Sequence, residues 1–389
     1  MRVTHVITRL IVGGAQENTV ASVLGLQLKP GLEVDLISGP TSGPEGSLVS
    51  AFDPFPKRLT LVPELVRPVH PWKDVLAFRR LARIFEEHRP EIVHTHSGKA
   101  GIVGRLAAAR AGVPMIIHTV HGPSFGPFQS GPANWIFRSA ERRAGRVTDH
   151  FVVVANAMSR QYLAAGIGRA EQYTKIASGF PLEPYLTASN DLALRARLSL
   201  GPQDFVVGKI ARLFKLKGHD DLFKIAPTLV RKCPQIKFLL VGGGEWRERF
   251  EGLARSLGLE RHFVFTGLVP PAEIPALVGI MDALIHLSTR EGLARALPQA
   301  LAAGKPVIAY DCDGANEVCL ENETGFLVRP GDLETLTRRL TELAGDATLR
   351  ERLGRNGRRL VRDQFPVERM VDDLHALYLK LAAEHRHSS

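Results

Sequence analysis

Two basic side chains, Arg212 and Lys217, follow an apolar run at residues 205–210 that is typical of a buried strand. Ligands bind at the carboxyl edge of an open parallel sheet, and two cations that converge on this edge suit a diphosphate. Arginine can hold phosphate through two N–H groups, whereas lysine acts as a point charge. The alternative interpretation is a solvated basic loop, which is a common environment for such residues.

A carboxylate and an amide in the segment 288–301, STREGLARALPQAL, could bind the rest of such a ligand. Glu291 precedes a predicted helix whose first amides are free, so they could bind phosphate while the carboxylate holds sugar hydroxyls. Gln299 comes about two helical turns later, so we expect it on the same helix face, where it could bind ribose hydroxyls. The alternatives are an acid favoured by the helix dipole and a surface amide.

Glycine-rich turns follow several of the predicted strands, where backbone can approach a ligand closely. The Gly13-Gly14 pair lacks the spacing of a dinucleotide-binding fingerprint and equally suits a plain turn. Gly242-Gly243-Gly244 and the turn at residues 266–270 (TGLVP) follow two strands of the second half. Their backbone groups could bind a nucleobase or phosphate, although each turn by itself is more often ordinary turn chemistry.

Short apolar runs alternate with helical segments along the chain, which predicts an α/β fold with parallel sheets. The predicted helices include residues 72–87, 99–111, 134–146 and a final amphipathic helix at 367–384. Turn residues around 176–204 interrupt the pattern and mark a domain boundary. The predicted strands are residues 3–7, 34–37, 92–93, 115–117 and 151–154 before this boundary, and 205–210, 238–241, 263–265, 283–286 and 306–309 after it.

The ordered set of motifs resembles the family-4 retaining glycosyltransferases of the GT-B fold, and the resemblance covers nearly the whole chain. It implies two Rossmann-like α/β/α domains that face each other across a cleft. Residues 1–185 would bind the acceptor, residues 186–366 the nucleotide-sugar, and residues 367–389 would pack back on the first domain. The matching motifs are Gly13-Gly14, residues 118–122 (HTVHG), Arg212 with Lys217, residues 242–245 (GGGE), the Glu291 segment, residues 303–308 (AGKPVI), Glu317 and residues 324–328 (TGFLV).

The resemblance also implies roles for individual residues. Arg212 and Lys217 would bind the donor diphosphate, Glu291 would hold hydroxyls of the transferred sugar, and His121 would face the reacting sugar. We therefore name His121 and Glu291 as catalytic residues. The further donor-site residues would be Gly14, Gly243, Gly244, Leu268, Val269, Gly292, Leu293, Ala294 and Gln299, and Gly13 would lie on the acceptor side.

Other histidines compete with His121 for a role in the site. His118 is expected on a strand and packed. His94 and His96 flank Thr95 and therefore share one side of a strand. His96 could line the acceptor side, whereas a hydrogen-bonded structural role is at least as good an interpretation for His94.

One position departs from the family pattern, in which a second glutamate stands where this chain has Gln299. An amide still donates and accepts hydrogen bonds, but it loses the charge-assisted bond to ribose. A catalytically silent nucleotide-sugar-binding subunit is therefore one alternative function. A nucleotide-sugar 2-epimerase of the same fold, which needs no acceptor, is the other.

Composition and charge narrow the class of partner. The chain has a formal net charge of +10, and residues 1–185 carry 21 Lys and Arg against 14 Asp and Glu. Aromatic and basic residues are not interleaved as in RNA-binding proteins, so we expect no nucleic-acid partner. A helix at 133–146 mixes Trp135, Ile136 and Phe137 with four arginines. It could contact an anionic membrane, or pack its aromatics inside and solvate its arginines.

The remaining expectations concern cofactors and location. Asp311-Cys312-Asp313 resembles a metal-binding D-x-D motif, but the basic pair already supplies charge for a diphosphate, so we expect no metal and no cofactor. Three cysteines without metal-ligand spacing, no apolar run of about 18 residues and no leader predict a cytoplasmic protein, with peripheral contact at the inner membrane face. The expected reaction is retaining transfer, with UDP as the default nucleotide, to a glycan or lipid-linked acceptor of the cell envelope.

Overall fold

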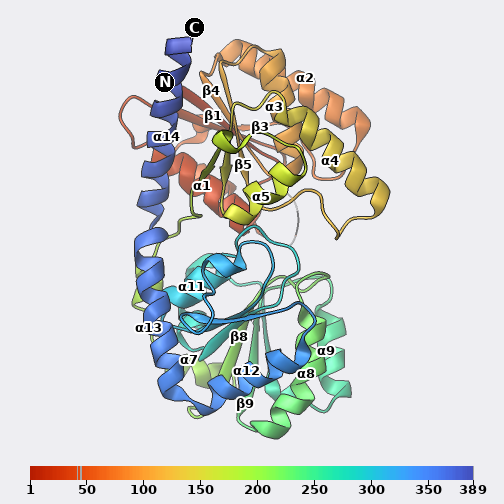
Figure 1. The fold of residues 1–389 in the computed structure, drawn as a ribbon, viewed down its shortest axis with the longest axis vertical. Coiled ribbons are helices and arrows are strands. Elements are labelled where there is room, and N and C mark those ends of the chain that lie inside the picture. The colour runs from red at the N-terminus through yellow and green to blue at the C-terminus, as the bar shows by residue number, and fades with distance from the viewer. Residues whose placement is uncertain (42, 44–45, 389) are drawn as a thin grey trace. The chain divides into compact units, whose positions relative to one another are not determined.

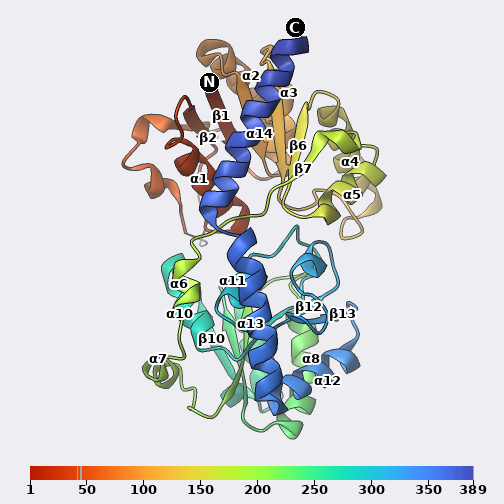
Figure 2. The same cartoon turned by 60° about the vertical axis from the view of Figure 1, so that its left-hand side comes forward.

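The computed structural model describes residues 1–41, 43 and 46–388, so residues 42, 44, 45 and 389 of the predicted ranges lie outside the described residues. The chain divides into two compact units (Figures 1 and 2). Unit 1 comprises Met1–Phe180 and Val367–Ser389, and unit 2 comprises Pro181–Pro366. Unit 2 thus begins five residues earlier than the predicted boundary, because the short helix α6 (Glu183–Leu186) packs on helices α10 and α11 of unit 2.

Unit 1 is built on a seven-stranded sheet in the order β3-β2-β1-β4-β5-β6-β7, in which every neighbouring pair is parallel. Parallel strands buried on both faces read as continuous apolar runs, as the sequence shows here. The strands are β1 (Arg2–Ile7), β2 (Glu33–Ser38), β3 (Leu59–Leu61), β4 (Ile92–His96), β5 (Met115–Val120), β6 (His150–Val153) and β7 (Tyr173–Lys175).

Helices cover both faces of this sheet. On one face, helix α1 (Gly14–Leu26) and the last helix α14 (Val367–Ser388) share a core with β1, β2 and β4 (Figure 2). On the other face, α2 (Pro71–His88) and α3 (Gly98–Arg110) enclose a second core, and α4 (Gly131–Gly145) lies next to α3. Helix α5 (Asn156–Ala164) packs against β6.

The contact between α1 and α14 depends on a glycine. A Cβ atom on Gly25 would lie 2.4 Å from Cγ2 of Val371, closer than two carbon atoms can approach. The absence of a side chain at residue 25 therefore lets the two helices meet over the sheet. Through this contact the last helix of the chain becomes part of unit 1.

Unit 2 repeats the same design with a six-stranded parallel sheet in the order β10-β9-β8-β11-β12-β13. In both units the order reverses beside the first strand, as in doubly wound nucleotide-binding folds. The strands are β8 (Phe205–Ile210), β9 (Ile236–Val241), β10 (Phe263–Gly267), β11 (Ala283–His286), β12 (Val307–Tyr310) and β13 (Gly325–Val328).

The main core of unit 2 lies between the sheet and helices α8, α9 and α12, which contribute large apolar side chains such as Phe223, Phe250 and Leu336. Helix α11 packs against both α10 and α13 (Figure 2). The helices are α7 (Leu192–Arg197), α8 (His219–Lys232), α9 (Arg247–Ser256), α10 (Ile274–Gly279), α11 (Ala296–Ala302), α12 (Leu333–Gly345) and α13 (Ala347–Gln364).

The predicted α/β class with two Rossmann-like domains is confirmed. The expected strands and long helices are present, with ends that differ by a few residues. The strands Leu59–Leu61, Tyr173–Lys175 and Gly325–Val328 were missed, because all three are edge strands of three or four residues and are too short to show a periodic pattern. The topology therefore adds an outer strand on each side of the predicted sheet of unit 1.

Candidate functional site

The loops after β8 and β11 carry the predicted charged residues of unit 2. These strands are neighbours at the centre of the sheet, where the strand order reverses. Loops that leave neighbouring strands at such a point turn away in opposite directions and leave a crevice that holds ligands. Lys217 follows β8 and Glu291 follows β11, so the topology places both residues at this edge.

Lys217 and Glu291 form an ion pair, in which Lys217 Nζ donates to Glu291 Oε1. Their side chains are 17% and 28% exposed, so the pair is accessible at one side. Burial raises the pKa of Glu291, but the Lys217 ammonium and the hydrogen bonds from Lys217 and Ser288 outweigh it, so the pKa lies below the ordinary range. Glu291 is therefore an ionised acceptor at neutral pH rather than a proton donor.

Arg212 lies in the same loop, and an aromatic ring connects it to Lys217. The Arg212 guanidinium carbon is 4.7 Å from the centroid of the Phe214 ring, and Lys217 Nζ is 6.0 Å from it. Cations at these distances are attracted to the ring face. The Phe214 ring therefore attracts both cations that were predicted to bind a diphosphate. This role of Phe214 was not predicted from the sequence.

Backbone hydrogen bonds tie the β8 loop to the β11 loop. The carbonyl oxygen of Leu216 accepts from Thr289 N at 3.0 Å and from Ser288 Oγ at 3.1 Å. Leu216 has a positive φ of 73°, a left-handed conformation that costs free energy for a residue with a side chain. The strained residue therefore lies between the predicted phosphate-binding cations and fixes their loop against Glu291.

Close packing against the β8 loop requires glycine in the turn after β9. A Cβ on Gly244, whose φ is +155°, would lie 2.4 Å from the carbonyl oxygen of Leu213. Leu213 N in turn donates to Gly243 O at 2.9 Å. The turn therefore supports the loop that carries Arg212, and nucleotide binding by Gly243 and Gly244 stays a prediction. Leu268 is 48% exposed, and Val269 beside it is half-buried; both follow β10.

The predicted helix geometry around Glu291 was wrong. Helix α11 begins at Ala296, so Glu291 lies in a loop ahead of it and shares no helix face with Gln299. Gly292, Leu293 and Ala294 are buried in this loop, and Gln299 is half-buried inside the helix. The loop is held by long-range contacts rather than by helical bonds, because Gly292 O accepts from Gly314 N at 2.9 Å.

The D-x-D segment has a role that the sequence did not indicate. Asp313 Oδ2 accepts a hydrogen bond of 2.7 Å from the backbone N–H of Glu291, and Asp311 Oδ1 accepts one of 3.2 Å from Asn316 Nδ2. Asp313 has a positive φ of 53°, a conformation that aspartate tolerates better than most residues. Asp313 therefore holds the Glu291 loop in place.

Three buried basic side chains near the ion pair were also missed. Four of their nitrogens, Lys209 Nζ, both ring nitrogens of His219 and His286 Nε2, have no hydrogen-bond partner among the described residues. His286 Nε2 lies 3.8 Å from Glu291 Oε1, too far for a hydrogen bond. Burial lowers the pKa of Lys209 to about 7, that of His286 to about 3 and that of His219 to about 2.

In unit 1, the predicted catalytic residue His121 directly follows β5 and ends a chain of buried polar side chains. His121 Nε2 is 3.0 Å from His96 Nδ1, and His96 Nε2 is 2.9 Å from His5 Nδ1. The hydroxyl of Tyr378 on α14 is 3.2 Å from His5 Nε2 and 2.5 Å from His94 Nδ1. His94 Nε2 in turn is 2.7 Å from Thr119 Oγ1.

The structure also places the other predicted site residues of unit 1. Direct contact of His96 with an acceptor does not fit the structure, because the residue is 1% exposed and both ring nitrogens have protein partners. His118 is buried on β5 with Nδ1 2.9 Å from Thr95 Oγ1, in agreement with its expected packed position. Gly13 and Gly14 lie where β1 gives way to helix α1, with Gly14 as the first helical residue.

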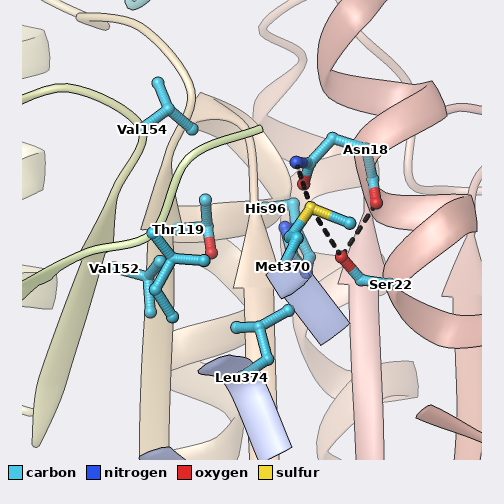
Figure 3. A pocket seen from close by; sticks show the side chains of 9 residues that line it. Asn18, Ser22, His96, Thr119, Val152, Val154, Met370 and Leu374 are labelled. Atoms are coloured by element: carbon cyan, nitrogen blue, oxygen red, sulfur yellow. Dashed lines mark hydrogen bonds between the residues drawn. The ribbon is translucent and has the colours of Figure 1, made fainter. Parts of the chain in front are cut away.

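A cavity of about 10 Å³ lies beside the histidine chain (Figure 3). This volume is about that of one water-sized probe. His96 and Thr119 line it from the sheet, Asn18 and Ser22 from α1, and Met370 from α14. A larger cavity of about 330 Å³ in unit 2 is lined by Arg247, Glu251, Ala254, Arg255, Glu260, Phe263 and Phe265, and none of these is a predicted site residue.

Two family models match this chain, one in each half. Residues 13–179 match the glycosyl transferase 4-like domain, and residues 191–360 match the glycosyl transferases group 1. The two matches cover most of unit 1 and most of unit 2. The first match contains His94, His96, Thr119 and His121 of the histidine chain, and the second contains the Lys217–Glu291 pair.

Similar proteins span most of the chain. An Escherichia coli UDP-Gal:alpha-D-GlcNAc-diphosphoundecaprenol alpha-1,3-galactosyltransferase is 25% identical over 98% of this chain and 97% of its own length. A GDP-mannose-dependent alpha-(1-6)-phosphatidylinositol monomannoside mannosyltransferase of Mycobacterium tuberculosis is 31% identical over 74% of this chain and 75% of its own. The crystal structure of Anabaena HepE in complex with UDP-glucose superposes with a TM-score of 0.82, at 23% identity over 98% of this chain and 100% of that one.

Across the described part of the chain, no helix combines the length and the apolar composition that crossing a bilayer requires.

Proposed function

Because the chain belongs to the family of group 1 glycosyl transferases, it is a glycosyltransferase that uses a nucleotide-sugar, and we propose that it transfers the sugar of a UDP-sugar to a glycan or lipid-linked acceptor. The acceptor would be a cell-envelope polysaccharide or its lipid-linked precursor. Support comes from the E. coli relative, whose name gives UDP-galactose as donor and a diphosphoundecaprenol acceptor. The name of the M. tuberculosis relative gives GDP-mannose as its donor, so the identity of the donor's nucleobase is the part of the proposal that most needs a test.

The Lys217–Glu291 pair at the sheet edge of unit 2 is the observation that carries this proposal. Donor binding would let Lys217 turn from the carboxylate to the diphosphate, where Arg212 joins it. Glu291, ionised by its surroundings, would then accept hydrogen bonds from sugar hydroxyls. As the glycosidic bond breaks, Arg212 and Lys217 would stabilise the growing negative charge of the leaving diphosphate.

We propose that the reaction retains the anomeric configuration and needs no metal. Glu291 would be occupied by hydrogen bonds from hydroxyls of the transferred sugar, so the leaving diphosphate itself would take the acceptor's proton on the face where the acceptor attacks. The two cations of the β8 loop would supply the positive charge that a metal provides elsewhere. His121, at the carboxyl edge of the unit 1 sheet, would serve the reacting sugar, as the family resemblance implies.

Contact with an anionic membrane and a cytoplasmic location are further proposals. Trp72 and Val69 are 76% and 68% exposed at the start of α2, and Trp135 and Ile136 are 71% and 56% exposed near the start of α4. Helices α2 and α4 flank α3 in one layer, and both follow strands of a parallel sheet, so their first turns lie at the same edge. Exposed tryptophans beside the basic residues of these helices suit a headgroup region.

Membrane contact is tested by sedimentation with vesicles that contain phosphatidylglycerol. The Trp72→Ser, Trp135→Ser double variant should bind them more weakly than wild type. Leu192→Ser, at a 56% exposed apolar residue of unit 2, is the matched control and should leave binding unchanged. Equal binding of all three proteins would refute a membrane contact at this layer.

The donor proposal is tested by thermal stabilisation with a panel of nucleoside diphosphates and their sugars. A ligand at about 100 times its dissociation constant adds about 2.7 kcal/mol to the free energy of unfolding. We expect UDP and one UDP-sugar to act most strongly, Arg212→Ala to abolish the effect, and Lys232→Ala, at the far end of α8, to preserve it. Stabilisation by a GDP-sugar instead would change the donor, and no response to any nucleotide would refute the assigned site.

A further inference from the structure

The polar chain under His121 uses every ring nitrogen of three buried histidines. His5 bonds to His96 and Tyr378, His94 bonds to Tyr378 and Thr119, and His96 bonds to His5 and His121. The rings of His94 and His96 stack with centroids 4.5 Å apart. The chain lies within unit 1 and combines residues from β1, β4, β5 and α14.

The same three histidines form the one cluster of three or more metal-ligating side chains among the described residues. A metal would need a lone pair from each ring aimed at a common point. Each of the six nitrogens is already within 3.2 Å of a protein partner, and both nitrogens of His94 are directed to hydroxyl groups. The geometry therefore favours a hydrogen-bonded chain over a metal site.

Burial keeps this chain uncharged. It lowers the pKa of His5 to about 3 and the pKa values of His94 and His96 well below the ordinary range, so all three rings are neutral at pH 7. A neutral imidazole has one donor nitrogen and one acceptor nitrogen. Once one bond in the chain has a direction, every other bond from Thr119 to His121 must therefore run the same way.

Tyr378 sets that direction. Burial raises its pKa well above the ordinary value, so the phenol keeps its proton and can donate only one hydrogen bond. Its oxygen is 2.5 Å from His94 Nδ1 but 3.2 Å from His5 Nε2. Bonds from O–H donors are shorter than bonds from N–H donors, so Tyr378 donates to His94 and accepts from His5.

We propose that Tyr378, through His5 and His96, holds His121 as the tautomer with its proton on Nε2, so that its Nδ1 is a hydrogen-bond acceptor. With His5 Nε2 donating to Tyr378, His5 Nδ1 accepts from His96 Nε2, and His96 Nδ1 accepts from His121 Nε2. Tyr378, His5 and His96 are positioning residues in this scheme. Its catalytic consequence rests on the proposed role of His121.

An acceptor nitrogen at this position suits the proposed substrate. A lone pair on His121 Nδ1 can accept a hydrogen bond from a sugar hydroxyl, whereas the opposite chain direction would place a proton on that nitrogen. Holding a histidine in one tautomer through a fixed partner is a recognised way to prepare it for catalysis. Helix α14 would thereby influence the site through Tyr378, which is 284 residues from His94 in the sequence.

Histidine tautomers are read directly from ¹⁵N shifts and two-bond couplings in protein labelled at histidine. At pH 7.5 we expect wild-type His121, assigned with His121→Ala, to show a protonated Nε2 and an unprotonated Nδ1. Tyr378→Phe removes the hydroxyl that sets the direction, so His121 should become a mixture of tautomers. Tyr162→Phe, another buried tyrosine of unit 1 outside the chain, should leave the signals unchanged. A proton on Nδ1 in the wild type, or unchanged signals in Tyr378→Phe, would overturn the proposal.

Kinetics separates this inference from the proposed function. Tyr378→Phe should lower kcat by about 10- to 100-fold with the donor KM unchanged, and Tyr162→Phe should change neither. If the tautomer changes but neither Tyr378→Phe nor His121→Ala affects kcat, the chain stands and the catalytic role of His121 is refuted. If His121→Ala inactivates the enzyme while the His121 tautomer is the same in wild type and Tyr378→Phe, the role stands and the positioning inference is refuted.

Discussion

The two units differ in how their buried basic side chains are hydrogen-bonded. Each buries basic side chains near the carboxyl edge of a parallel sheet whose strand order reverses at the centre. In unit 1, the ring nitrogens of His5, His94 and His96 are all hydrogen-bonded within the protein. In unit 2, Lys209 and His219 have no such partners among the described residues.

This difference indicates which interactions orient the side chains of each site. A buried polar group without a partner costs about 1–3 kcal/mol, so unit 2 carries a free-energy penalty beside Lys217 and Glu291 that the histidine chain of unit 1 avoids. Unit 1 orients its histidines by its own hydrogen bonds. The electrostatics of unit 2 will respond more strongly to an anionic ligand, since a nearby negative charge raises the pKa of Lys209 from its value of about 7.

The largest expected effect is a difference in acid sensitivity between the units. Four buried histidines of unit 1 and two of unit 2 have strongly lowered pKa values: His5, His94, His96 and His118, and His219 and His286. Burial also lowers the pKa of His150 in unit 1, which adds to the contrast in the same direction. An unfolded histidine binds a proton near pH 6.5 but a buried neutral one does not, so stability is complete above that pH and is lost as the pH falls. At pH 5 the loss is about 2 kcal/mol per histidine, or roughly 8 kcal/mol for unit 1 against 4 for unit 2.

Hydrogen–deuterium exchange with peptide resolution measures this difference. Peptides from β1, β4 and β5 should lose protection at a higher pH than peptides from β8 and β9. Salt at fixed pH is the control, because buried groups are screened little. Equal loss in both units, or earlier loss in unit 2, would contradict the contrast.

The next effect concerns Lys209 of unit 2, whose buried ammonium has no hydrogen-bond partner in the described part of the chain. Lys209→Met should raise the free energy of unfolding at pH 7 by roughly 1–3 kcal/mol, because it removes a buried polar group that has no hydrogen bond. The lowered pKa of Lys209 also makes the wild type gain stability between pH 7 and about 10, where the unfolded chain still binds the proton. Lys209→Met should lose this gain.

Urea unfolding at pH 7 and pH 9 checks the prediction, with the exposed Lys232→Met as the matched control. A Lys209→Met variant that is less stable than wild type at both pH values would show that Lys209 has a stabilising partner, and the contrast between the units would fail.

The smallest effect tests the partnered side of the comparison. Thr119→Val keeps the shape of the side chain but removes the hydroxyl that bonds His94 Nε2 at 2.7 Å. One buried nitrogen is then left without a partner, which should cost about 1–3 kcal/mol. The change in urea midpoint should therefore be opposite in sign to that of Lys209→Met. A neutral Thr119→Val would indicate that water replaces the hydroxyl, since Thr119 lines the small cavity of Figure 3.

Local patterns predicted most of the fold, and the same patterns misplaced one part of the site. The apolar runs identified the central strands because parallel strands are buried on both faces. The segment after β11 was predicted to become helical directly after Glu291, but the helix starts at Ala296 because Asp313 and Gly314 hold the intervening loop in another conformation. Helical periodicity cannot show such a contact, because its partners are more than twenty residues away along the chain.

The sequence by itself determined the two α/β units, the position of Arg212 and Lys217 after a strand, and Glu291 as the acidic residue of the adjacent loop. These properties depend on local composition and on motif order, which the chain displays directly. Only the tertiary structure decided that Lys217 pairs with Glu291, that buried Lys209 has no hydrogen-bond partner among the described residues, and that Tyr378 reaches His5 and His94. The physical reason is that burial and hydrogen-bond partnership arise from strand order and helix packing, which join residues far apart in the chain.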